Sequence, residues 1–469
     1  MCTTTNIYSV AYSLVWFPRI LGLAPISMKE GSKIYKFQSS TKILVYSVLV
    51  AGGIATLSLY IIYTMDYNFK RGPTIIFKIK EYAETLITAT FIIIICVNHR
   101  KLIFTITNTS YVDRKLLFIG VPITFKSHVR ILRIRTLCAV ILVLMPFFLF
   151  SYHFVIDTFG ILHILSSFLS VFQTTTSFYM QSLYQHFMFL IRQRFQIINT
   201  QISKISTDAS EHGVLNSELF GPLIREPLPS SSNQIIRTST FRIPTNNVIT
   251  PAEKRNSADG NLSCIMNTCQ QSCKVENTGT FHAISSSDSK CLAIQLPEES
   301  QKSRVRLLAH LHDCMCDTAE VLNSAFSVQN LLLSGKYLVD ITVNSYCCFF
   351  VFKVPHMNTL LTHYMYYSLY MTLCSVMQFT GILAASTFTA EEANRTSVAV
   401  HNAMQKLRQP SQKRELKEFS LQLLHRKLRF TACDFFPLDF TLLHSMIGAA
   451  TTYLVIVIQF HLANTSGLF

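Results

Sequence analysis

Charged side chains are scarce in this sequence of 469 residues: Asp, Glu, Lys and Arg together make up 14% of it, whereas hydrophobic residues make up 49%. Soluble proteins contain about 25% charged residues, so the composition argues against a soluble globular protein. Several long runs are almost free of charge, and about 20 consecutive apolar residues cross the hydrocarbon core of a bilayer as a helix. The sequence therefore predicts an all-α polytopic membrane protein.

Familiar catalytic and receptor motifs are also missing. The chain has no Walker loop, no Gly-x-Ser-x-Gly and no His-Glu-x-x-His, so we expect neither an enzyme nor a bound cofactor. It lacks Asn-Pro-x-x-Tyr in its last apolar run and Asp/Glu-Arg-Tyr after its third, which argues against a G-protein-coupled receptor. The run HLHDCMCD at 310–317 alternates His and Cys, and alternation on a helix scatters side chains around the axis, so we expect no metal site there.

Seven runs are long and apolar enough to be transmembrane helices. They lie near 43–65, 78–98, 133–153, 157–185, 329–352, 361–389 and 438–460. A further apolar stretch at 7–26 has Pro18 and Arg19 at its middle and no charged leader or clear cleavage site. We interpret it as an interfacial amphipathic segment, with a signal peptide as the alternative.

Basic residues are nearly absent from alternate connections between these runs. The connection between the third and fourth runs has none, and the connection between the fifth and sixth has only Lys353. The intervening connections are rich in Lys and Arg, and basic loops stay in the cytosol. The N-terminus is therefore predicted in the cytosol and the C-terminus outside. The net charge of +15 then reports topology, and we expect no nucleic-acid partner.

The chain divides into six predicted parts. They are a cytosolic segment with the interfacial helix (1–42), spans one to four (43–190), a largely disordered cytosolic loop (191–301), a cytosolic helix with spans five and six (302–390), cytosolic anchor helices (391–437), and span seven with a short outer tail (438–469). Residues 203–300 are rich in Ser, Thr, Asn and Pro without periodicity, as in disordered segments. Leu311, Met315 and Leu322 recur at helical intervals, so a helix is expected to run directly into span five. The amphipathic stretch 396–428 either packs on the chain's own helices or joins subunits.

Polar side chains form stripes on the predicted outer halves of several spans. The candidates for lining a hydrated ligand cavity are Glu84, Thr88, His163, Ser167, Ser170, Asn344, His363, Tyr366, Tyr367 and Tyr370. Lys336 lies four residues before Asp340, and an ion pair between them would lower the cost of burying both. Hydroxyl-rich ligands suit such walls. Ordinary hydrogen bonding between helices is the alternative.

The stretch TTYLVIVIQF at 451–460 places its polar and aromatic residues on one helix face. Thr452 and Gln459 are seven residues apart, as are Tyr453 and Phe460, with Ile456 between them. This face suits either a packed bundle or the wall of an aqueous path. Around a symmetry axis, Gln459 would offer amide oxygens to a cation and Phe460 would form an apolar ring that excludes water.

This stretch resembles the signature of insect gustatory receptors, which is Thr-Tyr, five hydrophobic residues and Gln-Phe in the last span. Thr452, Tyr453, Gln459 and Phe460 match it, and ILGLAPI near the start resembles the family's N-terminal segment. The neighbourhood TACDFFPLDFTLLHSMIGAATTYLVIVIQF looks most like the fructose-sensing branch, and Leu454 stands where the main sweet-receptor branch tends to carry an acidic residue.

The resemblance implies a ligand-gated, non-selective cation channel that passes Na⁺, K⁺ and Ca²⁺. It implies a homotetramer, or a hetero-oligomer with other gustatory receptors, in the plasma membrane of gustatory neurons. Its gate would be formed by Gln459 and Phe460, with Thr452 and Ile456 on the same face. A sugar, most readily fructose, would bind in the outer cavity, and inositol or a bitter plant compound is the alternative. A seven-helix receptor acting through a cytosolic partner and a transporter also stay open.

Overall fold

The computed structural model describes residues 22, 26–30, 35–64, 71–121, 123, 130, 134, 161–219, 298–352, 359–407 and 409–466. The chain separates into two units: Met1–Ser217 with Pro297–Phe469, and Glu218–Leu296. Almost all of the second unit lies outside the described residues, so the fold below is that of the first. The described part is nearly all helical, which confirms the predicted class.

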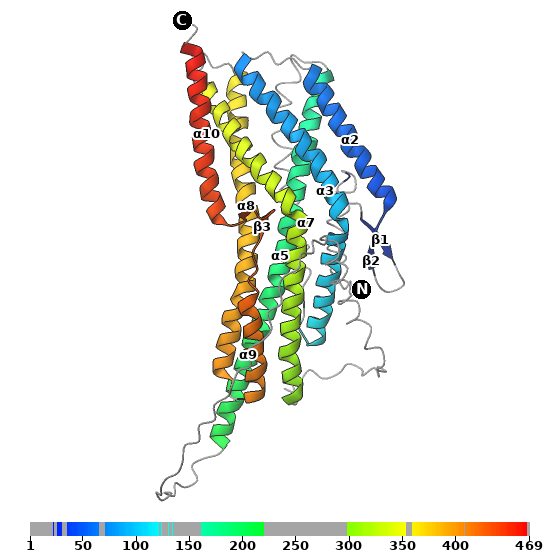
Figure 1. Ribbon diagram of the computed structural model, residues 1–469, viewed down its shortest axis with the longest axis vertical. Helices are drawn as coiled ribbons and strands as arrows, with labels where there is room; N and C mark the ends of the chain where they lie inside the picture. The colour runs from blue at the N-terminus through cyan, green and yellow to red at the C-terminus, as the bar shows by residue number, and fades with distance from the viewer. Residues whose placement is uncertain are drawn as a thin grey trace, which may run out of the picture. The chain divides into compact units, whose positions relative to one another are not determined.

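The described residues of this unit form seven helices, which Figure 1 shows side by side. They are α2 (Thr41–Thr64), α3 (Arg71–Phe118), α5 (Ile161–Leu219), α7 (Glu298–Phe352), α8 (Thr359–Lys406), α9 (Pro410–His425) and α10 (Phe440–Ser466). Four of them contain between 48 and 59 residues. At about 1.5 Å per residue such a helix is about 70–90 Å long, more than twice the hydrocarbon thickness of a bilayer. These helices therefore continue well beyond any membrane that they cross.

Within the described residues, four helical segments are long and apolar enough to span a membrane. They are Thr41–Thr64, Ile79–Phe118, Met365–Lys406 and Phe440–Ala463. They overlap the first, second, sixth and seventh predicted runs. The third predicted run lies outside the described residues except for Ile134. The fifth lies within α7, and the fourth overlaps α5 from Ile161; both helices carry buried polar side chains, such as Gln173 and Asp340, which lower their hydropathy.

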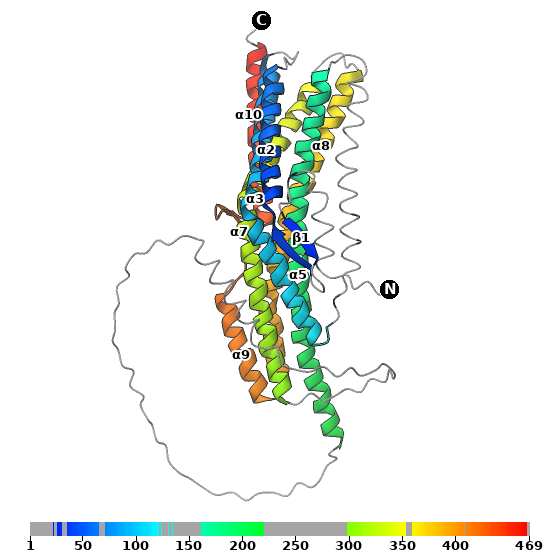
Figure 2. The ribbon, with the colours of Figure 1, turned by 90° about the vertical axis from the view of Figure 1, so that its right-hand side faces the viewer.

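One hydrophobic core runs through α3, α5, α7, α8 and α9. Fully buried members include Phe91 of α3, Phe195 of α5, Leu311 of α7, Phe379 of α8 and Leu416 of α9. On α7 the expected face is confirmed as part of a continuous helix, because Leu311, Met315, Leu322, Phe326 and Leu333 are all buried. Helix α7 contacts α3, α8, α9 and α10. Figure 1 shows it between α8 and α3, and Figure 2 shows it beside α9.

Helix α5 differs from the expected boundaries. It continues to Leu219, past residue 203 where the insert was expected to begin. Ile205, just beyond that position, is buried in the core. The amphipathic stretch 396–428 is divided between the end of α8 and α9, which begins at Pro410, as expected because proline interrupts a helix.

Helix α9 packs against α7 and α8 of its own chain. Leu416, Phe419 and Leu423 are buried there, whereas Leu424 is 66% exposed. The Arg306 guanidinium donates to both oxygens of Glu415 at 2.7 and 2.8 Å. Packing within the chain therefore accounts for most of the apolar face of α9.

Short strands flank the helices. β1 (Ile26–Glu30) pairs antiparallel with β2 (Tyr35–Ser39) just before α2. The predicted interfacial segment at 7–26 lies outside the described residues except for Gly22 and Ile26. β3 (Thr431–Ala432) and β4 (Phe436–Pro437) form a small hairpin between α9 and α10. This hairpin is held against α7 because Asn323 hydrogen-bonds to Thr431.

Candidate functional site

Two lysines and two carboxylates from α3 and α7 form a buried ion cluster. Lys80 Nζ lies 3.7 Å from Glu84 Oε1 and 3.5 Å from Asp340 Oδ1. Lys336 Nζ lies 3.6 Å from Glu84 Oε1 and 2.5 Å from Asp340 Oδ2. The side chains are only 5–14% exposed. Each ammonium thus contacts both carboxylates, and these four charges balance.

The spacing of the four residues explains how two helices build this cluster. Each Lys precedes a carboxylate by four residues, so each pair occupies one helix face. An isolated buried charge costs several kcal/mol, and only close opposite charges compensate for it. The Lys336–Asp340 pair was predicted from this spacing. Lys80 was not selected from the sequence, although its four-residue separation from Glu84 is the same signal.

Further polar side chains extend the cluster across the bundle. The Gln173 amide of α5 donates to Ser58 Oγ of α2 at 3.3 Å and to Thr85 Oγ1 of α3 at 3.1 Å. Tyr337 of α7 donates its hydroxyl hydrogen bond to Gln181 Oε1 of α5 at 2.6 Å. The ion cluster and these hydrogen-bonded side chains form a polar layer that involves α2, α3, α5 and α7.

Helix α8 reaches the cluster through Tyr367. This half-buried phenol lies within electrostatic range of Lys80, Glu84 and Asp340. The preceding residue, Tyr366, is 60% exposed. Two adjacent tyrosines thus occupy different environments, and only Tyr367 adjoins the ions.

The other predicted ligand residues occupy varied positions. Thr88 and Asn344 are buried one helical turn from Glu84 and Asp340 respectively, and Thr88 Oγ1 and Asn344 Nδ2 have no partner among the described residues. Ser170 and Tyr370 are half-buried on α5 and α8. His163, Ser167 and His363 belong to α5 and α8, but their side chains lie outside the described set. Two cavities are found among the described residues, one lined by α3, α5 and α7 and one of about 160 Å³ lined by α7, α8 and α10, and neither includes a residue of the ion cluster.

Helix α10 carries the sequence signature on its uncovered face. Tyr453 is 52% exposed, Ile456 41% and Phe460 68%, and Thr452 and Gln459 are exposed as well. Only 6% of the apolar segment of this helix is buried. Within the single chain, this face of α10 is therefore not packed against other helices.

The opposite face of α10 attaches the helix to α7. Leu454, Val457 and Ile458 pack against Val343, Tyr346 and Cys347. The Tyr346 hydroxyl lies 3.2 Å from His461 Nδ1. Three of the five hydrophobic residues between Thr-Tyr and Gln-Phe thus supply the intramolecular contact, whereas Val455, Ile456 and the four signature residues are exposed.

Comparisons with known proteins agree with this architecture. Residues 270–464 match the family model described as 7tm Chemosensory receptor. Putative gustatory receptor 2a of Drosophila melanogaster is 27% identical over 190 residues, which are 36% of this chain and 44% of that protein. Putative gustatory receptor 28b of the same species is 29% identical over 161 residues, which are 32% of this chain and 33% of that protein. The chain thus spans less than half the length of these relatives.

Weaker relatives carry two different taste names. Drosophila proteins named gustatory receptor for bitter taste 66a and gustatory receptor for sugar taste 43a are each 25% identical, over about a third of this chain. Among solved structures, the olfactory receptor OR5 of Machilis hrabei in complex with eugenol superposes with a TM-score of 0.58 at 11% identity. That superposition covers 97% of both chains, so the two share a fold.

Proposed function

We propose that this chain, which belongs to the insect gustatory receptor family of seven-transmembrane chemosensory receptors, is a taste receptor that acts as a ligand-gated, non-selective cation channel. One observation carries the proposal: α10 is apolar enough to cross a membrane, yet its signature face is left uncovered by its own chain. A helix of this kind is completed by lipid on one side and by other copies on the other. We place it at the plasma membrane of gustatory neurons.

The pore would form where copies of α10 meet around a symmetry axis, in a homotetramer or together with related receptors. Gln459 and Phe460 are adjacent and exposed, so each would form a ring. Amide oxygens can stabilise a partly dehydrated Na⁺, K⁺ or Ca²⁺, and an aromatic ring can close a pore by excluding water. Thr452 and Ile456 would line the same path two and one helical turns earlier.

The ligand would bind at the polar layer that includes the ion cluster. This layer lies roughly ten residues, or about 15 Å, from the nearer ends of its helices. Sugar hydroxyls both donate and accept hydrogen bonds, and this layer offers ammonium donors beside carboxylate acceptors. Tyr367 and Tyr370 add aromatic faces. Fructose is therefore the first ligand to test, and inositol presents the same hydroxyl chemistry.

A bitter alkaloid is the alternative ligand class. The 66a and 43a relatives are equally identical to this chain, so sequence similarity does not separate bitter from sweet. The ion pairs favour the sugar, because Glu84 and Asp340 are each compensated by two lysines, although Glu81 adjoins the same four ions and is a carboxylate that a cation could still use. A cationic alkaloid would need a carboxylate that is not already neutralised.

Two adjacent tyrosines provide a matched test of the ligand site. Tyr367→Phe should raise the fructose concentration for half-maximal response several-fold, because one hydrogen bond is worth about 0.5–1.5 kcal/mol. Tyr366→Phe makes the same change at a residue that is 60% exposed and should leave the response unaltered. Equal effects of the two variants would contradict the proposed site.

Lys336→Gln separates the two ligand classes. It leaves the carboxylates with one surplus negative charge, so the fructose response should fall while a cationic alkaloid such as quinine gains efficacy. Surface labelling checks that the variant reaches the membrane. A fructose response that survives while quinine still has no effect would argue against the ion cluster as the ligand site.

The orientation is part of the proposal: the N-terminus in the cytosol and the C-terminus outside. An epitope after Phe469 should stain on intact cells, and an epitope within 230–260 only after permeabilisation. The reverse pattern would remove the pore and ligand assignments together, because both depend on which ends of the helices face outward.

Expression of the chain alone in a receptor-free cell tests the function itself. Fructose, inositol and quinine are applied while calcium entry is recorded. Current in excised patches without nucleotides would separate a channel from a receptor that needs a cytosolic partner. A single-channel current far above carrier turnover would separate it from a transporter.

A further inference from the structure

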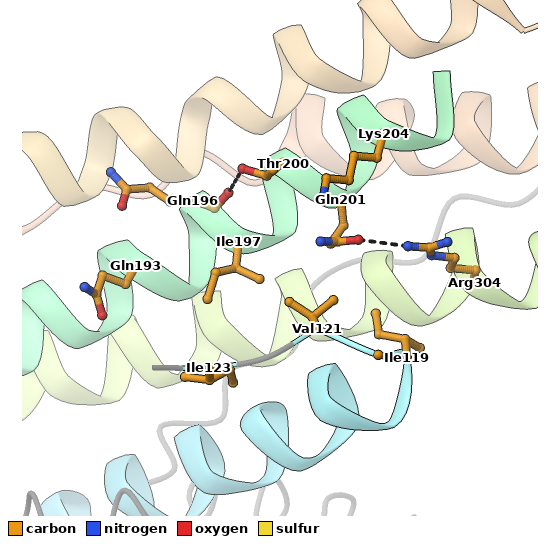
Figure 3. Close-up of a pocket in the computed structure, with 11 residues that line it drawn as sticks. Ile119, Val121, Ile123, Gln193, Gln196, Ile197, Thr200, Gln201, Lys204 and Arg304 are labelled. Atoms are coloured by element: carbon orange, nitrogen blue, oxygen red, sulfur yellow. Dashed lines mark hydrogen bonds between the residues drawn. The ribbon is translucent and has the colours of Figure 1, made fainter. Parts of the chain in front are cut away.

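A pocket lies at the opposite end of α7 from the ion cluster. It has a volume of about 550 Å³, is partly open, and is lined by the turn after α3, by α5 and by the start of α7 (Figure 3). Typical pockets for small ligands measure about 300–1,000 Å³. The space is therefore sufficient for a molecule the size of a nucleotide, and none of the residues assigned to taste or conduction lines it.

The described lining of this pocket is basic. It contains Lys204 and Arg304, and none of its described residues is Asp or Glu. Arg304 Nη2 donates to the neutral amide oxygen of Gln201 at 2.8 Å, and Arg304 Nε is buried without a partner among the described residues. Figure 3 shows the Arg304 side chain reaching toward Gln201 across the pocket.

Other arginines in the same region are satisfied differently. Arg194 donates two hydrogen bonds to Asp113, each 2.9 Å long. Arg306, two residues after Arg304, makes a bidentate pair with Glu415. A guanidinium favours such two-point contacts with carboxylates or phosphates. Arg304 has no carboxylate within ion-pair distance among the described residues. An anionic ligand that enters the pocket could therefore take that place.

The remaining lining is mixed. Gln193 and Gln196 present amides from α5, and Ile119 and Ile197 present apolar surface. Amides can hydrogen-bond to the polar edge of a ring, and the isoleucines can cover its faces. A ligand with one anionic end and one flat, partly apolar end matches this arrangement.

The distance between the pocket and the bilayer favours a soluble ligand over a lipid headgroup. The sequence predicts that the second span ends near residue 98, and Ile119 follows that position by roughly 20 helical residues, or about 30 Å. A phospholipid headgroup does not reach that far. In the proposed orientation the pocket opens to the cytosol, where phosphate esters are abundant.

We propose that this pocket binds a soluble phosphate ester of nucleotide size, with the phosphate at Arg304 and the uncharged end among Gln193, Gln196 and Ile197. The site is separate from the taste ligand and from the pore. It joins α3, α5 and α7, the helices that also build the polar layer. The proposal requires no channel activity.

Direct binding tests it. The full chain is purified into nanodiscs of phosphatidylcholine alone, and ATP, AMP, inositol hexakisphosphate and inorganic phosphate are titrated by calorimetry. We expect ATP or AMP to bind, and Arg304→Gln to weaken that binding at least tenfold. Lys417→Gln makes the same charge change at an exposed residue of α9 and should bind as the parent does. Tighter binding of inositol hexakisphosphate than of ATP would exclude a nucleotide and overturn the proposed occupant.

A second variant tests the pocket without changing Arg304, because it fills the space with a large side chain. Thr200→Trp introduces a large ring from an exposed lining position and should abolish binding with little effect on thermal unfolding. Binding that persists in Thr200→Trp, equal losses in Arg304→Gln and Lys417→Gln, or no binding of any phosphate ester would each overturn the proposal.

Discussion

Helices α7 and α10 lie side by side and are opposites in composition and burial. Helix α7 carries Lys336, Asp340 and His312, all of them buried. Helix α10 has no charged residue between Phe440 and Ser466, and only 6% of its apolar segment is buried. In a soluble protein the apolar helix would be the buried one. In a bilayer, lipid replaces water around apolar side chains, so the helix that needs protein partners is the polar one.

The comparison also indicates where each helix finds its partners. Most charges of α7 are paired within the same chain: Lys336 and Asp340 with α3, Arg306 with α9, and its acidic residues near 313–320 with Arg426 just after α9. The signature residues of α10 have no such neighbours in the described part of the chain. Helix α7 is therefore packed mainly by its own chain, whereas the signature face of α10 is left for contacts with other molecules. Four predictions test this contrast, in order of the expected effect on folding.

The largest loss of folding stability should follow from breaking the buried ion pair between α5 and α3. Arg194 is fully buried and forms its bidentate pair with Asp113. Arg194→Met leaves the Asp113 carboxylate uncompensated, which costs about 3–5 kcal/mol. Thermal unfolding in detergent should show a large drop in Tm. Arg414→Met is the matched control, because its side chain is 81% exposed and surface pairs contribute about 0–1 kcal/mol.

The double variant Asp113→Leu with Arg194→Met should recover much of the lost stability, because it removes both charges. A double variant as unstable as the single one would show that packing of the arginine, rather than the unpaired carboxylate, dominates.

The next effect is a pH dependence centred on His312. This ring packs against Phe195 and Phe419 with centroids 5.2 and 5.7 Å away. Burial lowers the pKa of His312 to about 4, while nearby Arg426 acts in the same direction and a contact with the Ala393 carbonyl opposes it. The unfolded chain binds this proton below about pH 6.5. Stability should thus be complete above pH 6.5 and fall by about 3 kcal/mol as the pH drops toward 4.

Tm measured from pH 7.5 to 4.5 checks this window. His312→Phe keeps an aromatic ring and should flatten the decline over that range, whereas exposed His401→Phe should not. The same slope in parent and His312→Phe would assign the pH dependence to other groups.

A change on the uncovered helix should cost little stability and alter conduction instead. Phe460 is 68% exposed in the chain, so Phe460→Ala lacks most of the roughly 3–5 kcal/mol penalty of a buried aromatic. If the ring closes the pore, the variant should pass current without ligand. Gln459→Ala should change ion selection or the balance between open and closed states.

Surface labelling accompanies these recordings, because a channel that fails to assemble is also silent. Phe460→Ala that reaches the surface with normal resting current, permeability and ligand response would place the gate elsewhere on α10.

The smallest effect is expected from removing the second unit. Residues 221–296 belong to a unit separate from the helical bundle. A chain lacking them should retain its Tm and its ligand response within experimental error. Normal surface expression with an abolished response would instead give this insert a role in gating.

Much of the architecture follows from local patterns in the sequence. Apolar length predicted α2 and α10, and helical periodicity predicted the continuous helix through Leu311 and Leu322 into α7. The Lys336–Asp340 pair was predicted because four residues along a helix place two side chains on one face. These features depend on residues close together in the chain, so no knowledge of neighbouring helices was needed.

Contacts between helices were decided by the tertiary structure alone. Lys80 and Asp340 are 3.5 Å apart, and Arg194 reaches Asp113, although neither pairing leaves a trace in local spacing. The exposure of Phe460, and the position of Arg304 away from any described carboxylate, likewise depend on which helices stand next to α10 and α7. The sequence by itself determined which residues share a helix face. Only packing decided what each face meets, because an ion pair or a bare surface arises from elements distant in the chain.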